Sequence, residues 1–240
     1  MLRPVLLALA LWIGLSASLA ADDAWIGIDR VVAVGHLHGD YEGFVSVLRS
    51  AGLLDNDGNW AGGKTHLVQT GDILDRGPGS RKIMDLLMQL EKQAKAADGM
   101  VHSLIGNHEA MNVYGDLRYV TKEEFAAYVD GKAAGNGDPV HPPGYAEHRG
   151  AFGPKGVYGK WIRGNNAVIQ INNTLFLHGG ISPKYADTGI RKRSTSACGT
   201  SWPLPTACKA ASCWMKTVRC GIAGWRWAMK RSLPHTCRRC

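Results

Sequence analysis

The sequence predicts an α/β fold in which buried strands alternate with helices. Four short apolar runs rich in β-branched residues predict the strands, at residues 31–34, 66–70, 100–105 and 174–177. A glycine turn carrying histidine, aspartate or asparagine follows each run directly or within a few residues. Because ligands collect at the carboxyl ends of strands in open α/β sheets, we expect these four turns to meet at one edge and form the functional site.

Helical patterns separate the first three predicted strands. One covers residues 41–50 and the other 80–97, where Ile83, Leu87 and Leu90 lie on one apolar face and Asp98-Gly99 ends the helix. The segment 55–59 contains a DNDGN sequence and predicts a hairpin turn, because the acidic ligand that a calcium loop needs at its twelfth position is His66.

A long connection, residues 111–166, separates the third turn from the fourth. It carries helical patterns at 122–129 and 145–152 around a stretch rich in glycine and proline. Long irregular connections in compact domains commonly cover a functional site. We therefore expect a cap over the site that shapes the choice of substrate.

The four turns contain residues that bind metals. They read Gly35-His36-Leu37-His38-Gly39-Asp40, Gly71-Asp72-Ile73-Leu74-Asp75-Arg76-Gly77, Gly106-Asn107-His108-Glu109 and His178-Gly179-Gly180. Mixed nitrogen and oxygen donors suit divalent transition metals better than calcium or an iron–sulfur cluster. Taken singly, such aspartates commonly cap turns or helices and such histidines are commonly structural, but four clusters together favour a metal site.

In this order, the turns resemble the signature of the calcineurin-like metallophosphoesterases of the phosphoprotein phosphatase type, which reads GDxHG, GDxxDRG, GNHE and HGG. The longer context around His178 is most similar to that of the bacterial Shewanella-like protein phosphatases. The resemblance covers residues 30–189. It implies an αββα sandwich flanked by helices, here incomplete at its C-terminal end.

The resemblance also implies a role for each residue of the turns. His36 and His38 would bind the first metal ion, Asp72 would bridge two ions, and Asn107 and His178 would bind the second. The ions would be Mn, Fe or Zn, and a water bridging them would attack phosphorus. Three further residues would act in catalysis, with His108 as general acid, Asp75 holding its ring and Arg76 clamping the phosphate.

Other polar residues near the turns receive no ligand role. We expect Glu109 and Asp40 to support the geometry of the loops without contacting the metal. The histidines outside the motifs match no family ligand and are taken as ordinary: His66, His102, His141 and His148.

Two departures from the family pattern bear on activity. His36 stands where the family has an aspartate, which removes one negative charge from the site. After residue 190 no family sequence is recognisable, although the family takes one more histidine ligand and one more phosphate-binding arginine from that region. Residues 190–240 contain all six cysteines and no Asp or Glu, a composition that predicts a frameshifted tail without stable structure.

The two ends of the chain indicate its expected location and the origin of its net charge. Arg3 precedes an uncharged apolar run at 5–15 and then small residues, which predicts a signal peptide at 1–20 and a periplasmic or secreted protein. The run is too short for an ordinary membrane span, so no membrane association is expected after cleavage. The net charge of +8 comes from the tail, and no nucleic-acid partner is expected.

The predicted function is metal-dependent hydrolysis of phosphate monoesters, with a phosphorylated protein or a small phosphoester as substrate. A serine/threonine or tyrosine protein phosphatase fits best. One alternative is a dinucleoside polyphosphate hydrolase of the same superfamily. The other, from a different class, is an inactive truncated remnant that acts at most as a binding protein.

Overall fold

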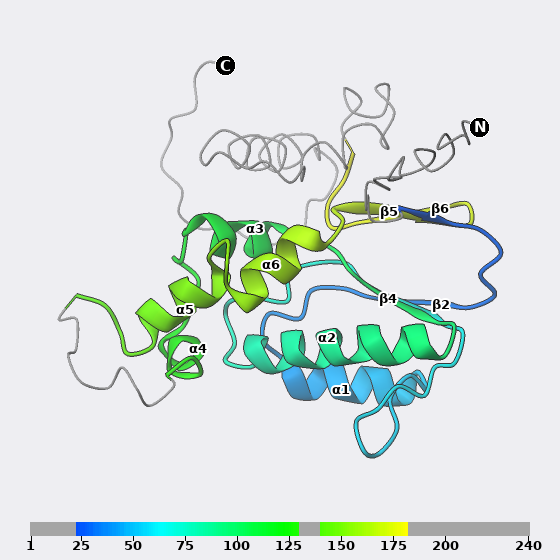
Figure 1. The fold of residues 1–240 in the computed structure, drawn as a ribbon, viewed down its shortest axis with the longest axis horizontal. Coiled ribbons are helices and arrows are strands. Elements are labelled where there is room, and N and C mark those ends of the chain that lie inside the picture. The colour runs from blue at the N-terminus through cyan, green and yellow to red at the C-terminus, as the bar shows by residue number, and fades with distance from the viewer. Residues whose placement is uncertain (1–22, 130–139, 182–240) are drawn as a thin grey trace, which may run out of the picture.

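The computed structural model describes residues 23–129 and 140–181, and these form two small sheets that face each other (Figure 1). The first sheet is wholly parallel and has the order β2 (Val31–Val34), β3 (His66–Gln69), β4 (Met100–Ser103). In the second, β1 (Ala24–Trp25) runs parallel to β5 (Val168–Ile171), and β5 runs antiparallel to β6 (Thr174–Leu177).

Two helices, α1 (Tyr41–Ser50) and α2 (Ser80–Ala96), cover the outer face of the first sheet (Figure 1). Side chains alternate along each strand, so Leu67 of β3 packs against these helices while its neighbour Val68 packs toward the second sheet with Ile169 and Ile171. Both faces of β3 are therefore buried, as in other parallel sheets that are covered on both sides. Each fully buried leucine contributes about 1.5–3 kcal/mol to the burial free energy.

The predicted strands and the first two predicted helices are present. α1 has the predicted bounds, and α2, β3 and β4 end slightly earlier than predicted. One arrangement differs from expectation. The fourth strand, β6, belongs to the second sheet, so the fourth motif reaches the site from across the sandwich and not along the edge of one sheet.

The described part of the connection between the third and fourth motifs carries helices and packs into the body of the protein. It begins within α3 (Asn107–Tyr114) and contains α4 (Lys122–Ala126), α5 (Tyr145–Phe152) and α6 (Val157–Gly164). Phe152, Tyr158 and Ile162 join the same core cluster as α1 and α2. α6 is anchored to α2 by the Tyr158 hydroxyl, which donates to Asp85 Oδ1 at 2.7 Å. Whether this segment shapes substrate choice stays a prediction.

Several predictions lie outside the described residues: the signal peptide at 1–20, the glycine-rich centre of the connection at 130–139, and the tail at 190–240. Among the residues that the structure describes, every helix is too short or too polar to cross a bilayer.

Candidate metal centre

Two glycines let the second and third motif loops touch. Gly71 has a φ of +93°, which disfavours other residues. A Cβ atom built on it would lie 2.6 Å from the backbone nitrogen of Gly106. A Cβ atom on Gly106 would in turn lie 2.6 Å from Oδ1 of Asp72. Any side chain at either position would therefore push the loops that carry Asp72 and Asn107 apart.

Backbone hydrogen bonds hold the first loop against the second. The N–H groups of Leu37 and His38 both donate to the carbonyl of Asp72, at 2.9 and 3.0 Å, and Gly39 N–H donates to the carbonyl of Ile73 at 2.9 Å. Hydrogen bonds of the main chain alone therefore fix how the first and second loops lie against each other.

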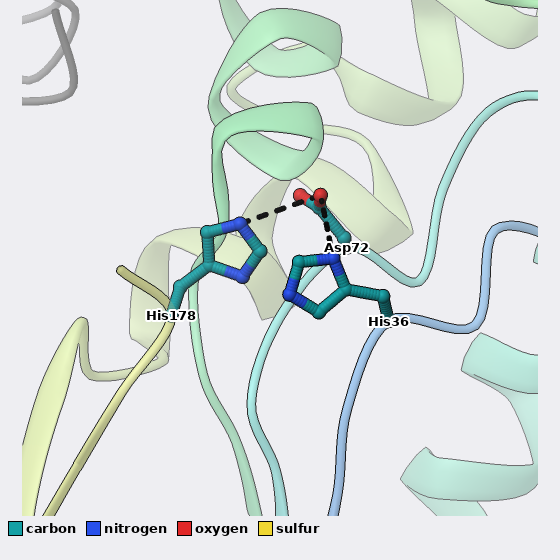
Figure 2. Close-up of side chains that lie close together, drawn as sticks. All are labelled: His36, Asp72 and His178. Carbon is teal, nitrogen blue, oxygen red and sulfur yellow. Dashed lines mark ion pairs between the residues drawn. The ribbon is translucent and has the colours of Figure 1, made fainter. Parts of the chain in front are cut away.

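The carboxylate of Asp72 is the centre of the site, and its side chain is almost fully buried. Its Oδ2 atom lies 3.5 Å from Nδ1 of His36, 3.6 Å from Nε2 of His38, 3.9 Å from Nε2 of His108 and 3.3 Å from Nε2 of His178. Figure 2 shows His36 and His178 approaching this carboxylate from two different strands' ends. Residues from all four motifs thus meet at one point.

Two of these histidines are oriented by carbonyl groups behind them. Nδ1 of His38 lies 3.0 Å from the carbonyl of Leu74, and Nδ1 of His178 lies 2.9 Å from the carbonyl of Thr70. A carbonyl only accepts, so Nδ1 carries the proton in each ring and Nε2 faces Asp72. This is the support that metal-binding histidines ordinarily have.

The resulting arrangement of acceptors suits a cation. With its proton on Nδ1, the neutral ring of His178 presents a lone pair at Nε2, which lies 3.1 Å from Oδ1 of Asn107 and 3.3 Å from Oδ2 of Asp72. Three electron-rich atoms that face one another need a positive charge between them or a proton on one of them. The residues present therefore fit a divalent ion, and their nitrogen and oxygen donors suit Mn, Fe or Zn.

Electrostatics keep Asp72 in its charged form. Burial alone would raise the pKa of Asp72. When no cation lies between these atoms, a proton on Nε2 of His178 takes its place, and the hydrogen bond and positive charge of this protonated ring, together with the backbone N–H of His108, outweigh burial and lower the pKa of Asp72. Burial likewise would lower the pKa of His178, and the hydrogen bond to Asp72 raises it instead. A charged carboxylate is the form that a metal ion requires.

Among the described residues, two groups of potential ligands share Asp72. One consists of His36, Asp72 and His178, and the other of His38, Asp72 and His108. A common carboxylate is what a bridging ligand would provide. His36 stacks on His178, with ring centroids 4.6 Å apart, and lies farther from His38, at 6.0 Å. The ring of His36 therefore stands on the side of His178, whereas the resemblance pairs it with His38.

The predicted catalytic residues are adjacent to this cluster. Nδ1 of His108 lies 2.5 Å from Oδ2 of Asp75, and both side chains are buried. Arg76 Nη2 lies 3.5 Å from Nε2 of His108, on the side of the ring that faces Asp72. The structure therefore brings together all eight residues that the sequence singled out.

Two further residues contact His108, Asp75 or Arg76 and were not predicted from the sequence. Asn112, one helical turn after His108, donates from Nδ2 to the free oxygen of Asp75 at 2.9 Å. Tyr119 accepts a hydrogen bond from Arg76 N–H at its carbonyl, and its ring lies 5.3 Å from that of His108. The i, i+4 spacing of His108 and Asn112 on a helix was the available signal for the first. Nothing in the sequence pointed to Tyr119.

Glu109 and Asp40 lie where supporting residues should. Glu109 is buried, and its carboxylate accepts from the backbone N–H groups of Asp72, Ile73 and Gly106 at 2.7–2.8 Å. Asp40 caps α1 by accepting from Gly43 N–H at 2.9 Å. The first links the second and third loops, and the second begins the helix that follows the first loop.

The remaining histidines of the described residues lie apart from the cluster. His66 and His102 are buried partners whose nearest nitrogens are 3.1 Å apart, with Trp25 against the ring of His102. His148 is enclosed by the rings of Phe125, Tyr128 and Phe152, and His141 stacks on Tyr145.

The chain is similar to known proteins in sequence and in fold. The chain is 34% identical over 193 residues to Shewanella-like protein phosphatase 2 of Arabidopsis thaliana, a match that covers 68% of this chain and 49% of the relative. It is 32% identical over 158 residues to Shewanella-like protein phosphatase 1 of Plasmodium berghei, covering 66% of this chain and 40% of the relative.

A solved structure has the same fold. The cold-active protein-tyrosine phosphatase of a psychrophilic Shewanella species superposes with a TM-score of 0.62 at 35% sequence identity, over 75% of this chain and 52% of that one. The chain thus spans about half the length of the relatives it matches. The sequence pattern of the calcineurin-like phosphoesterases, a family with a two-metal centre, matches residues 29–203. The chain belongs to the calcineurin-like phosphoesterase family.

Proposed function

We propose that this protein is a metal-dependent phosphomonoesterase that acts on phosphorylated proteins. The observation that carries the proposal is the meeting of four separate loops at Asp72, with the His108–Asp75 pair and Arg76 at the edge of the same cluster. The names of the relatives, which are protein phosphatases, support the class of substrate.

The metal ligands in this proposal are the residues whose donor atoms face one another: His36, His38, Asp72, Asn107 and His178. Two divalent ions held there, when bound, supply activation of water and neutralisation of charge on the phosphate. We propose manganese, iron or zinc, since all three accept this mixture of nitrogen and oxygen donors.

In this proposal Arg76 binds the phosphate and His108 acts as the general acid. The guanidinium group of Arg76 presents parallel N–H donors that match two phosphate oxygens. His108 donates a proton from Nε2 to the oxygen of the departing alcohol, because its Nδ1 is held by Asp75 and its Nε2 lies on the open side next to Arg76. Asp75 keeps the ring in that orientation.

His36 weakens the site without abolishing it. Its side chain is 54% exposed, while that of Asp72 is 5% exposed. Burial and the neighbouring His178 lower the pKa of His36, so the ring is neutral at pH 7 and available to bind a metal. A neutral imidazole in place of a carboxylate leaves the site with one negative charge fewer, and a divalent ion is held less tightly.

The same proposal includes export. The sequence signal at 1–20 would direct the protein to the periplasm or outside the cell. An alkaline-phosphatase-type fusion of residues 1–30 to a reporter that is active only after export tests this point. An inactive fusion with normal expression would reject it.

Hydrolysis of p-nitrophenyl phosphate by the purified 240-residue chain with added Mn²⁺ tests the enzymatic proposal. The chain is compared with His36→Asp, with a version whose reading frame after residue 190 is restored, and with His141→Gln as a histidine control away from the cluster. Activity in the chain as given supports an enzyme. Activity only after the reading frame is restored identifies the chain as an inactive remnant. Faster hydrolysis of dinucleoside polyphosphates than of phosphopeptides would instead support the alternative of a dinucleoside polyphosphate hydrolase.

A further inference from the structure

His108, the general acid of the proposed reaction, is held by its main chain as well as by its ring. Its backbone N–H donates to Oδ1 of Asp72 at 3.1 Å, and its carbonyl accepts from Nδ2 of Asn112 at 3.0 Å. Nδ1 of the ring lies 2.5 Å from Oδ2 of Asp75. Two of these contacts lead to the second motif loop, and the third leads one turn along helix α3 to Asn112.

Asn112 closes a ring of contacts with His108 and Asp75. It is fully buried and lies four residues after His108, on the same side of α3. Its Nδ2 atom donates to Oδ1 of Asp75 at 2.9 Å and to the carbonyl of His108 at 3.0 Å. One side chain therefore contacts both the backbone of the general acid and the carboxylate that orients its ring.

The amide group of Asn112 can adopt only one orientation. If its oxygen and nitrogen were exchanged, Oδ1 would face the carboxylate of Asp75 and the carbonyl of His108, which both accept. In the observed orientation Oδ1 is buried and has no hydrogen-bond partner within the described residues. An unpaired buried oxygen disfavours the folded state, and asparagine is a poor helix former. The stability of α3 alone therefore does not account for an asparagine at this position.

The carboxylate of Asp75 has one donor on each of its oxygens. Its side chain is fully buried, with Oδ2 against Nδ1 of His108 and Oδ1 against Nδ2 of Asn112. The backbone of Asp75 has a φ of +69°, in the left-handed region that residues other than glycine adopt only where the surroundings hold them. Because a buried carboxylate needs donors for both oxygens, the contact with Asn112 fixes which way this carboxylate faces.

The position of Asn112 is fixed in turn by the connection between the third and fourth motifs. Arg149 of α5 donates from Nη1 to the carbonyl of Asn112 at 2.7 Å. This carbonyl is among the last four of α3, which lack partners inside a helix. The guanidinium group also lies against Gly115, where a Cβ atom would be 3.2 Å from Nη2. Helix α5 thus holds the end of the helix that carries Asn112.

We infer that Asn112 is a positioning residue, which orients the carboxylate of Asp75 and through it the ring of His108. The general acid must keep Nδ1 toward Asp75 so that Nε2 faces the oxygen of the departing alcohol. Asn112 is buried behind this pair, so it acts through Asp75 and through the backbone of His108. The inference rests on the proposed function only for the role of His108 as general acid.

Three variants of the full chain test this role. Asn112→Leu removes the donor and keeps a similar volume, and Asn112→Ser is a milder change that leaves a shorter group with a single donor. Val113→Ala is the control, because it removes apolar volume from the core at the next position of α3. Asn112→Ser keeps the test possible if Asn112→Leu does not fold.

The loss of activity should depend on the leaving group. p-Nitrophenolate departs with little help from an acid, whereas phenolate is a stronger base and needs a proton. With Mn²⁺, we expect kcat of Asn112→Leu to fall about tenfold for p-nitrophenyl phosphate and about 100-fold for phenyl phosphate, with KM changed less than about twofold. Asn112→Ser should show the same trend with smaller losses, and Val113→Ala should keep the wild-type ratio between the two substrates.

A purely structural role of Asn112 predicts a different pattern. Loss of folded protein lowers the rate for both substrates by the same factor. An unchanged ratio between the substrates in both Asn112 variants would therefore overturn the inference. A ratio that changes to the same extent in Val113→Ala would overturn it too.

A second readout needs no enzymatic activity. The proton on Nδ1 of His108 should give a downfield proton NMR resonance in the wild type, because it lies in a short hydrogen bond to Asp75. We expect this resonance to move upfield or to broaden in the Asn112 variants and to persist in Val113→Ala. The same resonance in all four proteins would reject the positioning role. If the wild type hydrolyses neither substrate while the resonance follows the expected pattern, the proposed function fails and the positioning contact stands.

Discussion

Nδ1 of His108 lies 2.5 Å from Oδ2 of Asp75, and both side chains are buried behind the cluster of metal-binding residues. The contact joins the third motif loop to the second. It leaves Nε2 of His108 directed toward Arg76 and Asp72, so a single hydrogen bond sets which ring nitrogen faces a substrate.

Asp75→Asn should therefore impair catalysis more than binding. The amide keeps the shape of the carboxylate, but it can also donate to Nδ1 of His108 and so favours the tautomer with its proton on the other ring nitrogen. We expect kcat to fall about 100-fold with KM nearly unchanged. Steady-state kinetics with p-nitrophenyl phosphate measures this, and Asp57→Asn in the exposed turn is the control. An equal loss in both variants would contradict the assigned role.

Arg76→Lys should impair substrate binding more. Lysine keeps the charge but offers one point donor where the guanidinium offers two parallel N–H groups. We expect KM for phosphomonoesters and the inhibition constant of inorganic phosphate to rise about tenfold. Arg49→Lys, on an exposed helix turn away from the site, should have no effect. Unchanged phosphate inhibition in Arg76→Lys would remove Arg76 from the phosphate site.

His36→Asp should strengthen metal binding. The substitution adds a carboxylate close to Asp72 and removes an exposed ring that stacks on His178. We expect the affinity for Mn²⁺ to rise about tenfold and activity at limiting Mn²⁺ to rise with it. Calorimetric titration gives the affinity directly. An affinity equal to or below that of the wild type would show that His36 is a sufficient ligand as it stands.

The buried pair His66 and His102 should make the fold sensitive to acid. Burial lowers the pKa of His102 from 6.5 to about 3, and the neighbouring His66 adds to this shift. The unfolded chain therefore takes up a proton near pH 6.5 that the folded chain refuses. Stability from this histidine is complete above pH 6.5 and is lost as the pH falls toward 3, by at most about 1.4 kcal/mol per pH unit.

Denaturant unfolding between pH 7.5 and 4 checks the effect. His102→Gln cannot be protonated, so its unfolding free energy should fall less steeply with acid than that of the wild type. His141→Gln, which alters a half-buried histidine that stacks on Tyr145 away from this pair, should keep the wild-type slope. Parallel curves for wild type and His102→Gln would contradict the pKa that burial imposes.

The sequence predicts most of the site because its geometry is local. Asp72 and His178 each follow a short strand, and glycines at the turns allow the close approach of backbones that a sequence motif records. Helix α1 follows from Asp40 as its cap and from an apolar face, and both are visible in the sequence. Such features depend on neighbours within a few residues.

Other features depend on contacts between distant segments and escaped prediction. Helix α6 contains Gly159 and a β-branched start, so its propensity is poor, and it forms because Tyr158 and Trp161 bond to α2. Tertiary packing of this kind overrides propensity. The placement of His36 beside His178 likewise follows from the meeting of two sheets.

Glu124 illustrates the same limit in helix α4. In the sequence it is one of two adjacent glutamates at the start of a short helix, where acidic residues are ordinary. Only the fold shows that Glu123 is exposed and Glu124 is buried.

Titration of Mn²⁺ into the purified chain, followed by calorimetry and by elemental analysis of the dialysed protein, tests the central claim that the four loops form one metal centre around Asp72. We predict two ions per wild-type chain and loss of both in Asp72→Asn, with Asp57→Asn unchanged. Equal stoichiometry and affinity in the wild type and Asp72→Asn would contradict the claim.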